Sequence, residues 1–275
     1  MQLFTDLPET ADIETSSDDY ARRFSGEIGT WFLKVQNDAV LRMLSGYPSA
    51  SILDVGGGHG QLTGPLVQSG FKVTVLGSSD SCKNRIQEFT DKGLCKFQVG
   101  NLIELPYSDG SFDAVISFRL LPHVTSWKQL IRELTRVSRK LVIIDYPSKR
   151  SINYISPSLF GAKKRLEGNT RPYTLFNESE ILEVFRLYDF IYAKRYAEFF
   201  LPMVLHRVLK SPGLSSTTER LCRLCGLTYL FGSPVILKLV RKTAGPYECL
   251  VSRPSSILSG SGNHYCRRPA FENSA

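Results

Sequence analysis

A glycine-rich stretch directly after a short apolar run is the part of this sequence best suited to chemistry. Residues 51–55 (Ser-Ile-Leu-Asp-Val) are typical of a buried strand, and glycines follow at positions 56, 57, 58 and 60. Glycine allows positive φ angles and lets a ligand approach the main-chain N–H groups at the start of a helix. At the carboxyl end of a parallel strand, this geometry is typical of a site for a nucleotide-like cofactor.

The spacing of the glycines distinguishes two kinds of cofactor site. A dinucleotide-binding loop needs Gly-x-Gly-x-x-Gly, but counting from Gly56 and Gly58 places Gln61 where the third glycine should be. The order found is Asp-x-Gly-x-Gly-x-Gly, formed by Asp54, Gly56, Gly58 and Gly60. This order resembles motif I of the class I S-adenosylmethionine-dependent methyltransferases. The resemblance covers residues 45–145 well and the rest of the chain in outline.

Strands and helices alternate along the chain, which predicts right-handed β–α–β units and a parallel sheet. Strands are expected at residues 51–55, 71–76, 95–99, 141–145, 190–193 and 234–240, with another ending at residue 117. Helices are expected at residues 28–44, 61–68, 80–89, 127–137 and 177–187. We therefore predict an α/β fold, a doubly wound Rossmann-like methyltransferase sheet with helices on both faces. The pairing of the last two strands resembles the family's antiparallel end, so the sheet should be mostly parallel with an antiparallel final strand.

Length and composition favour one large domain with insertions. The chain has 275 residues, and its hydrophobic content of 42% supports a sizeable core. The expected parts are a flexible acidic segment (1–19), the methyltransferase domain (20–244, with insertions at about 146–176 and 199–231) and a disordered tail (245–275). No Lys or Arg precedes Arg22, unlike a secretory signal, and no run of 18 apolar residues predicts a membrane span. We expect a cytoplasmic protein.

Charge is unevenly distributed along the chain. Residues 1–138 carry a net charge of −3, whereas residues 139–275 carry +11. Such asymmetry suggests that the second half meets an anionic partner: a phosphorylated or carboxylated metabolite, an acidic lipid surface or nucleic acid. A solvated basic surface that aids solubility is the alternative.

The cysteines favour reduced thiols over a metal site. Cys222-x-x-Cys225 could supply two zinc ligands. However, both cysteines lie in a helical apolar pattern and no second close pair exists, so buried reduced thiols fit better. We predict no metal.

The resemblance to motif I implies how S-adenosylmethionine would be held. The glycines would let the backbone approach its methionine and ribose portions, and Asp54 would orient the loop or the amino group of the donor. Asn101 and Leu102 fall where the family contacts adenine, through a side-chain amide and a backbone group. Arg23 precedes the first long helix, in a segment that caps the donor in the family, and could pair with its carboxylate.

One position departs from the family's pattern. The family usually carries an acidic residue at the end of the second strand, where it holds the ribose hydroxyls, and this sequence has Gly77 there. Either Ser78 or Asp80 takes over that role, or the ribose is held more weakly. Basic residues that follow would also suit a 2′-phosphate, so a nicotinamide cofactor remains an alternative.

Residues 117–124 (Ser-Phe-Arg-Leu-Leu-Pro-His-Val) bear on the acceptor. They lack the Asn/Asp-Pro-Pro-Tyr/Phe signature of enzymes that methylate amino groups of nucleic acids. The stretch resembles instead the small-molecule group that includes ubiquinone and menaquinone biosynthetic methyltransferases. His123 could be a general base for an oxygen or nitrogen acceptor, or simply hydrogen-bond its own loop.

The predicted function is therefore methyl transfer from S-adenosylmethionine to a small organic acceptor that is anionic or aromatic. An RNA or protein methyltransferase that uses the basic half is one alternative. A catalytically inactive S-adenosylmethionine-binding module is another, motivated by Gly77.

Overall fold

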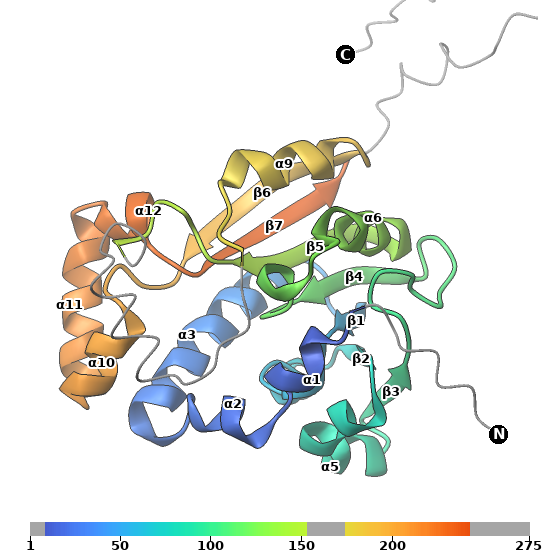
Figure 1. The fold of residues 1–275 in the computed structure, drawn as a ribbon, viewed down its shortest axis with the longest axis horizontal. Helices are drawn as coiled ribbons and strands as arrows, with labels where there is room; N and C mark the ends of the chain where they lie inside the picture. The colour runs from blue at the N-terminus through green and yellow to red at the C-terminus, as the bar shows by residue number, and fades with distance from the viewer. Residues whose placement is uncertain (1–8, 153–173, 243–275) are drawn as a thin grey trace, which may run out of the picture. The chain divides into compact units, whose positions relative to one another are not determined.

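The computed structural model describes residues 9–152 and 174–242, and these form a seven-stranded sheet in the order β3-β2-β1-β4-β5-β7-β6 (Figure 1). The strands are β1 (Ser51–Val55), β2 (Lys72–Gly77), β3 (Cys95–Val99), β4 (Phe112–Ser117), β5 (Ser138–Tyr146), β6 (Phe190–Ala197) and β7 (Val235–Arg241). β7 is antiparallel to both of its neighbours, and the other pairs are parallel. The predicted fold class is confirmed.

The helices flank this sheet. They are α1 (Ala11–Thr15), α2 (Asp18–Arg22), α3 (Gly26–Leu44), α4 (Thr63–Gln68), α5 (Gln87–Asp91), α6 (Trp127–Val137), α9 (Glu178–Arg186), α10 (Met203–Leu209), α11 (Pro212–Leu224) and α12 (Leu227–Phe231). Short 3₁₀ helices are η1 (Gly57–His59), η2 (Asp80–Ile86) and η3 (Leu121–His123). The helix expected over residues 80–89 is therefore divided between η2 and α5.

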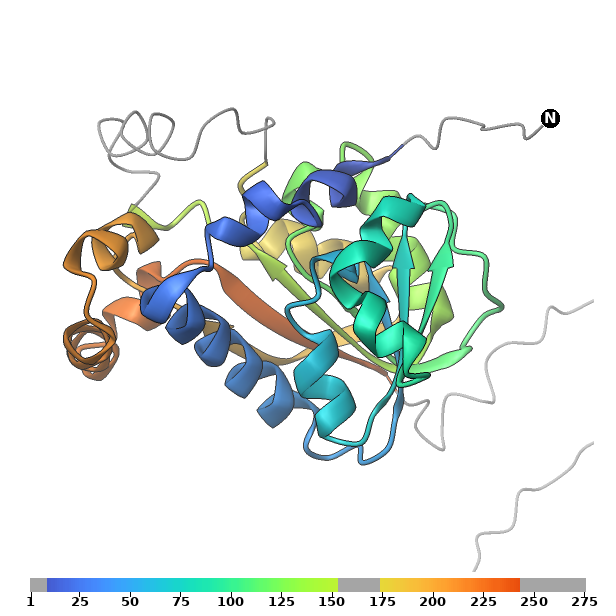
Figure 2. The same cartoon turned by 90° about the horizontal axis from the view of Figure 1, so that it is seen from below.

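Two apolar layers cover the faces of the sheet (Figures 1 and 2). α6 and α9 pack on one face, against strand residues such as Leu53 and Val142. α3 and α4 pack on the other, against the alternate residues, such as Ile52 and Ile143. Central strands buried on both faces must be continuously apolar, which is why their sequences predicted them well.

Two strands are longer than predicted. β5 begins at Ser138 rather than residue 141, since α6 leads directly into it. β6 continues to Ala197 rather than residue 193 and pairs with β7 over its whole length. β6 is an edge strand with largely exposed side chains. Its polar residues therefore give no continuous apolar run from which the full length of the strand could be predicted.

The acidic N-terminal segment contains helix, in contrast to the flexible chain that its composition suggested. Ser17 caps α2 by accepting a hydrogen bond from the backbone N–H of Tyr20. Ala11 and Asp12, on α1, are buried. Within residues 9–152 and 174–242, no helix combines the length and apolar character needed to cross a membrane.

The second expected insertion forms α10, α11 and α12. Most of the first one, with its basic residues 163–165, and the expected tail lie outside the described residues. Because β6 runs parallel to β1, β2, β4 and β5, the carboxyl ends of all five strands meet at one edge of the sheet. The loops at that edge hold the residues of the candidate site.

Candidate functional site

The glycine loop follows β1 and is closely packed. Gly56 and Gly60 have φ angles of +75° and +70°, in the left-handed region that side chains disfavour. A Cβ on Gly58 would lie 2.5 Å from the carbonyl oxygen of Cys82 and 2.5 Å from Oγ of Ser16. All three predicted glycines therefore occupy positions where a larger residue meets a conformational or steric penalty.

Asp54 lies beneath this loop with an unsatisfied carboxylate. The side chain is fully buried, and neither carboxylate oxygen has a hydrogen-bond partner among the described residues. A Cβ on Gly57 would overlap this carboxylate, so the loop passes directly over it. Burial raises the pKa of Asp54 to about 7. A buried acceptor of this kind is stabilised by an ammonium or N–H donor on a ligand.

The end of β2 explains why Gly77 replaces an acidic residue. A Cβ on Gly77 would lie 2.8 Å from Cβ of Cys82 and 3.1 Å from the ring of Phe97, which leaves no room for a carboxylate side chain. A carboxylate reaches this strand end from α1 instead. The backbone N–H of Ser78 donates to Asp12 at 2.7 Å, and the Ser78 hydroxyl also donates to it.

Asp12 was missed in the sequence because it lies 66 residues before its partner, Ser78. The carboxylate is fully buried and also accepts a hydrogen bond from the thiol of Cys82 at 3.3 Å. Of the two predicted substitutes for an acid at Gly77, Ser78 is buried in this network, whereas Asp80 is an exposed first residue of η2.

The other predicted donor contacts are placed as follows. Leu102 is fully buried in the same apolar cluster as Ala11. The Asn101 side-chain oxygen accepts a hydrogen bond from the N–H of Ile103 at 3.1 Å, so it shapes its own turn. Arg23 follows α2 and is partly buried, with its guanidinium 5.0 Å from the ring centroid of Tyr20.

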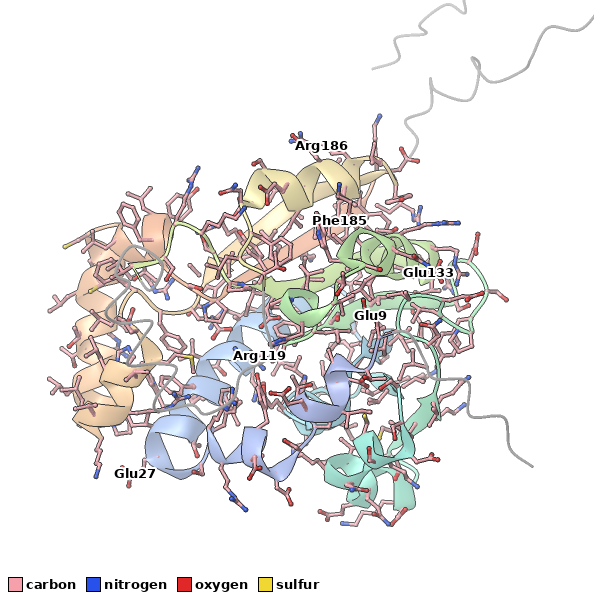
Figure 3. The ribbon with its side chains drawn as sticks, in the orientation of Figure 1. Glu9, Glu27, Arg119, Glu133, Phe185 and Arg186 are labelled. Carbon is pink, nitrogen blue, oxygen red and sulfur yellow. The ribbon has the colours of Figure 1, made fainter. Side chains whose placement is uncertain are left out.

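Arg119 follows β4 (Figure 3), and its contacts link this strand to β5 and to α3. It has a φ of +60°, a conformation that costs a residue other than glycine about 1–3 kcal/mol and clusters at functional sites. Asp145, at the end of β5, holds it: the Arg119 N–H donates to this carboxylate at 2.7 Å, and Nε lies 3.6 Å from it. The guanidinium also donates to Gln36 on α3 at 2.8 Å. The strained backbone is thus stabilised by a buried ion pair.

Glu198 follows β6 and faces this pair. The side chain is only 1% exposed, and neither carboxylate oxygen has a hydrogen-bond partner among the described residues. Burial raises the pKa of Glu198 to about 8, with Arg119 lowering the pKa and Asp145 raising it. This carboxyl group can therefore bind and release a proton close to neutral pH. Sequence reasoning missed Arg119 and Glu198, although each is a charged residue beside an apolar stretch.

The two histidines of the site differ in their surroundings. His59, in the glycine loop, is buried and its Nδ1 accepts a hydrogen bond from the N–H of Gln61 at 3.1 Å. Burial, together with the charge of Arg119, lowers the pKa of His59 to about 3, so the ring is neutral. His123 is partly buried at the end of η3, where its N–H donates to the carbonyl of Leu120 at 2.9 Å. Its role as a base stays a prediction.

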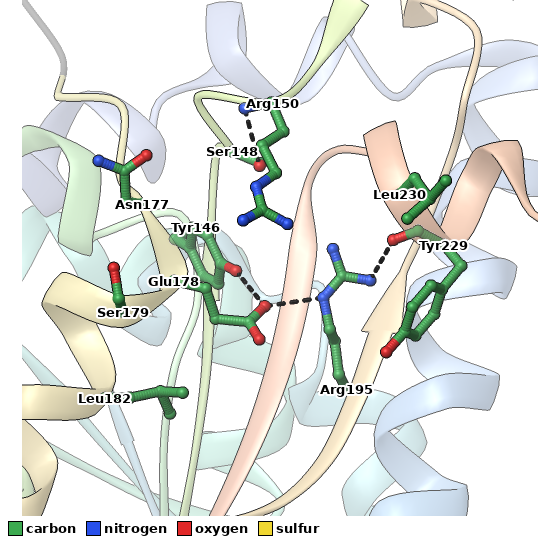
Figure 4. A pocket seen from close by; sticks show the side chains of 10 residues that line it. All are labelled: Tyr146, Ser148, Arg150, Asn177, Glu178, Ser179, Leu182, Arg195, Tyr229 and Leu230. Atoms are coloured by element: carbon green, nitrogen blue, oxygen red, sulfur yellow. Dashed lines mark hydrogen bonds and ion pairs between the residues drawn. The ribbon is translucent and has the colours of Figure 1, made fainter.

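A pocket of about 420 Å³ opens where β5 and β6 meet α9 and α12 (Figure 4). Within it, Tyr146 and Arg195 each donate a hydrogen bond of 2.7 Å to one carboxylate oxygen of Glu178. The Arg150 guanidinium also lines the pocket and has no ion-pair partner among the described residues. Among the described residues, the pocket therefore presents a cation without an ion-pair partner beside the carboxyl edge of the sheet.

Metal ligands do not gather in the described part of the chain, where no three His, Cys, Asp or Glu side chains form a group suited to an ion. Cys222 and Cys225 are free thiols on or just after α11. Cys222 is partly exposed and Cys225 is exposed, so they are not buried as their apolar neighbours suggested.

Part of the sheet and its connections matches a known protein family. Residues 53–143, from the strand that carries Asp54 to β5, match the sequence model described as "Methyltransferase domain". The chain contains a methyltransferase domain. The domain as a whole has the Rossmann-like fold of the class I methyltransferases.

Solved structures share the fold of this methyltransferase domain at low sequence identity. Magnesium protoporphyrin IX methyltransferase from Synechocystis, crystallised with bound SAH, has a TM-score of 0.57 and 20% identity, covering 82% of this chain and 94% of that one. A possible histamine N-methyltransferase from Thermotoga maritima has a TM-score of 0.59 and 17% identity, covering 84% and 99%.

Curated relatives match over shorter stretches. The 2-methyl-6-phytyl-1,4-hydroquinone methyltransferase of Synechocystis is 35% identical over 104 residues, which are 36% of this chain and 33% of that protein. Norajmaline N-methyltransferase of Rauvolfia serpentina is 37% identical over 65 residues, 22% and 21% of the two chains. The chain thus matches a third or less of the length of these relatives.

Proposed function

We propose that the protein is an S-adenosylmethionine-dependent methyltransferase that acts on a small organic acceptor. The observation that carries the proposal is the buried Asp54 carboxylate, which has no hydrogen-bond partner among the described residues. It lies beneath a loop whose glycines leave no room for side chains, within a methyltransferase domain. When bound, S-adenosylmethionine supplies a methyl group on a sulfonium, so transfer is a direct displacement on carbon. The protein's part is then orientation, electrostatics and exclusion of water.

The donor side is supported by groups that could complement each portion of this molecule. Asp54 would accept hydrogen bonds from the donor's ammonium group, and Arg23 would pair with its carboxylate. Asp12, positioned by Ser78, would hold the ribose hydroxyls in place of the acid that Gly77 cannot accommodate. Leu102 and Asn101 would contact adenine, as the family resemblance implies.

The acceptor side is supported by Arg119, Asp145 and Glu198. An acceptor nitrogen or oxygen must lose a proton when it gains a methyl group, and a carboxyl group with a pKa near 8 can take that proton. Arg119 and Asp145 would orient the acceptor against the donor. His123 is a second candidate base, at the same edge of the sheet.

Anionic character of the acceptor is supported by the Arg150 guanidinium in the pocket of Figure 4 and by the +11 charge of residues 139–275. A small molecule is favoured over nucleic acid because residues 117–124 lack a base-methylating signature. Similarity to relatives that are named as hydroquinone and porphyrin methyltransferases supports the same choice.

Calorimetric titration of the purified protein with S-adenosylmethionine tests the proposal. We expect binding by the wild type and none by Gly58→Arg, because a side chain at this position would collide with Cys82 and Ser16 and displace the loop. Gly46→Arg is the matched control, since a Cβ at this exposed position meets no atom within 4 Å. Binding of a nicotinamide cofactor, with none of the sulfonium donor, would overturn the proposal.

A further inference from the structure

α10 and α11 have the reverse of the usual amphipathic arrangement. On α11, Ser215 and Glu219 are buried, whereas Leu214, Leu221 and Leu224 are 53%, 59% and 84% exposed. On α10, His206 is fully buried, and the residues that are exposed are Leu205, Val208 and Leu209. A helix that only supports a fold turns its apolar side inward. These two helices turn theirs to the outside.

The polar groups on the buried side of α10 and α11 form hydrogen bonds within the fold. The carboxylate of Glu219 accepts hydrogen bonds from the backbone N–H groups of Phe200 and Leu201, each at 2.9 Å, and lies 3.1 Å from Nε2 of His206. It thereby ties the beginning of the α10 region to α11. The exposed leucines take no part in this network, so the fold itself does not account for them.

The exposed apolar residues occupy one side of each helix. Leu214, Leu221 and Leu224 are separated by seven and three residues, and Leu205, Val208 and Leu209 by three and one, spacings that keep each set on one helical face. α10 and α11 lie side by side at the end of the sheet domain remote from α5 (Figures 1 and 2). We call these six side chains the leucine surface.

Positive charge accompanies the leucine surface. Lys210 and Arg220 are exposed and have no ion-pair partner among the described residues. Glu219 is the only acidic residue between residues 203 and 231, and it is buried. Exposed cations beside an apolar helix face, with no exposed acid, are typical of helices that lie in the interface of an anionic bilayer.

We propose that the leucine surface docks on an anionic lipid bilayer. Its side chains would enter the boundary between headgroups and acyl chains, and Lys210 and Arg220 would meet lipid phosphates. A second copy of the chain fits less well, because a symmetric contact would bring the same cations together. Nucleic acid fits less well too, since a leucine face would stay exposed to water.

Co-sedimentation of the full-length protein with vesicles tests this proposal. One set of vesicles is phosphatidylcholine and phosphatidylglycerol at 70:30, and the other is pure phosphatidylcholine. The test variant is Leu221→Ser/Leu224→Ser, and the matched control is Leu94→Ser/Leu187→Ser, whose leucines are 48% and 76% exposed elsewhere. The changed leucines are exposed, so melting temperatures should stay close to that of the wild type.

We expect at least tenfold stronger partitioning onto the anionic vesicles, a loss of tenfold or more in the test variant and no change in the control. Lys210→Gln/Arg220→Gln should lose the preference for anionic lipid. Absence of binding to either vesicle, or an equal effect of the test and control variants, would overturn the proposal. So would light scattering that shows a dimer in the wild type and a monomer in Leu221→Ser/Leu224→Ser, since this would assign the surface to a second copy.

Discussion

Asp12 supplies the carboxylate at the end of β2, where the packing around Gly77 leaves no room for an acidic side chain. Gly77 has no space for a side chain, because Cys82 and Phe97 pack against its backbone. The carboxylate at the end of β2 comes from Asp12, held by two hydrogen bonds from Ser78.

Replacement of Asp12 by Asn should weaken S-adenosylmethionine binding by about 1–3 kcal/mol, the usual effect of losing a hydrogen bond to a charged group. Calorimetric titration measures this difference directly. Asp80→Asn is the control, since Asp80 is exposed, and it should bind the donor as the wild type does. If Asp80→Asn weakens binding and Asp12→Asn does not, the ribose role belongs to Asp80.

At the scale of elements, α1 and α2 connect parts of the site that the sheet alone does not join. α1 carries Asp12 to the end of β2, and Ser16, just after it, lies against the glycine loop. Arg23 and Phe24 follow α2, and the ring of Phe24 lies 5.2 Å from the guanidinium carbon of Arg119. This short stretch therefore contacts both the proposed donor side and the proposed acceptor side.

Removal of residues 1–17 should reduce S-adenosylmethionine affinity at least as much as Asp12→Asn, because it removes the whole α1 contact. The sheet should persist, since its two apolar layers come almost entirely from other elements. Titration calorimetry measures affinity, and far-ultraviolet circular dichroism checks the fold. A chain that lacks only residues 1–8 retains α1 and should bind normally. Unchanged affinity without residues 1–17 would contradict a role of α1 in donor binding.

At the scale of the whole molecule, buried ionisable groups make stability depend on pH. Glu198 and Asp54 have native pKa values of about 8 and 7, above their usual values of 4.5 and 3.8. The native state therefore holds these protons more tightly than the unfolded chain does. The stabilisation is complete at low pH and is lost as pH rises through each native pKa, by up to about 1.4 kcal/mol per pH unit for each group. His59 acts in the opposite sense, because its depressed pKa removes stability below about pH 6.5.

Glu198→Gln should flatten the fall in stability between pH 7 and 8.5. In this window Asp54 is mostly ionised, and the remaining decline comes from Glu198, which faces Arg119 and Asp145. Urea unfolding of wild type and variant at several pH values measures the slope. Asp54→Asn should reduce the decline between pH 5 and 7 without abolishing it, because Glu198 contributes to the decline in that window as well. Identical slopes above pH 7 in wild type and Glu198→Gln would show that Glu198 ionises normally.

Part of the positive charge of the second half can be assigned to two regions of the structure. The second half carries +11, and part of it lies on α10 and α11 beside exposed leucines, while Arg150 lines a pocket. One partner therefore need not explain the whole basic half. A lipid surface and an anionic group on a small acceptor would use different residues.

The sequence by itself determined the features that depend on neighbouring residues. The apolar runs of β1 and β5 and the helical spacing of α6 express burial along one segment, so they can be recognised without knowing the partners. The glycine loop was equally clear, because positive φ angles at Gly56 and Gly60 are local requirements. The exposed edge strand β6 was predicted too short for the same reason, since polar residues give no signal of pairing.

Only the tertiary structure decided which distant residues meet. Asp12 reaches Ser78 across 66 positions, and Arg119 joins Gln36 across 83. Strand order brings Glu198 to the same edge, where it faces Arg119 and Asp145. Their individual side chains look ordinary in the sequence. Burial gives Glu198 a raised pKa and a carboxylate without a hydrogen-bond partner among the described residues, and both properties arise only when separate segments exclude water together.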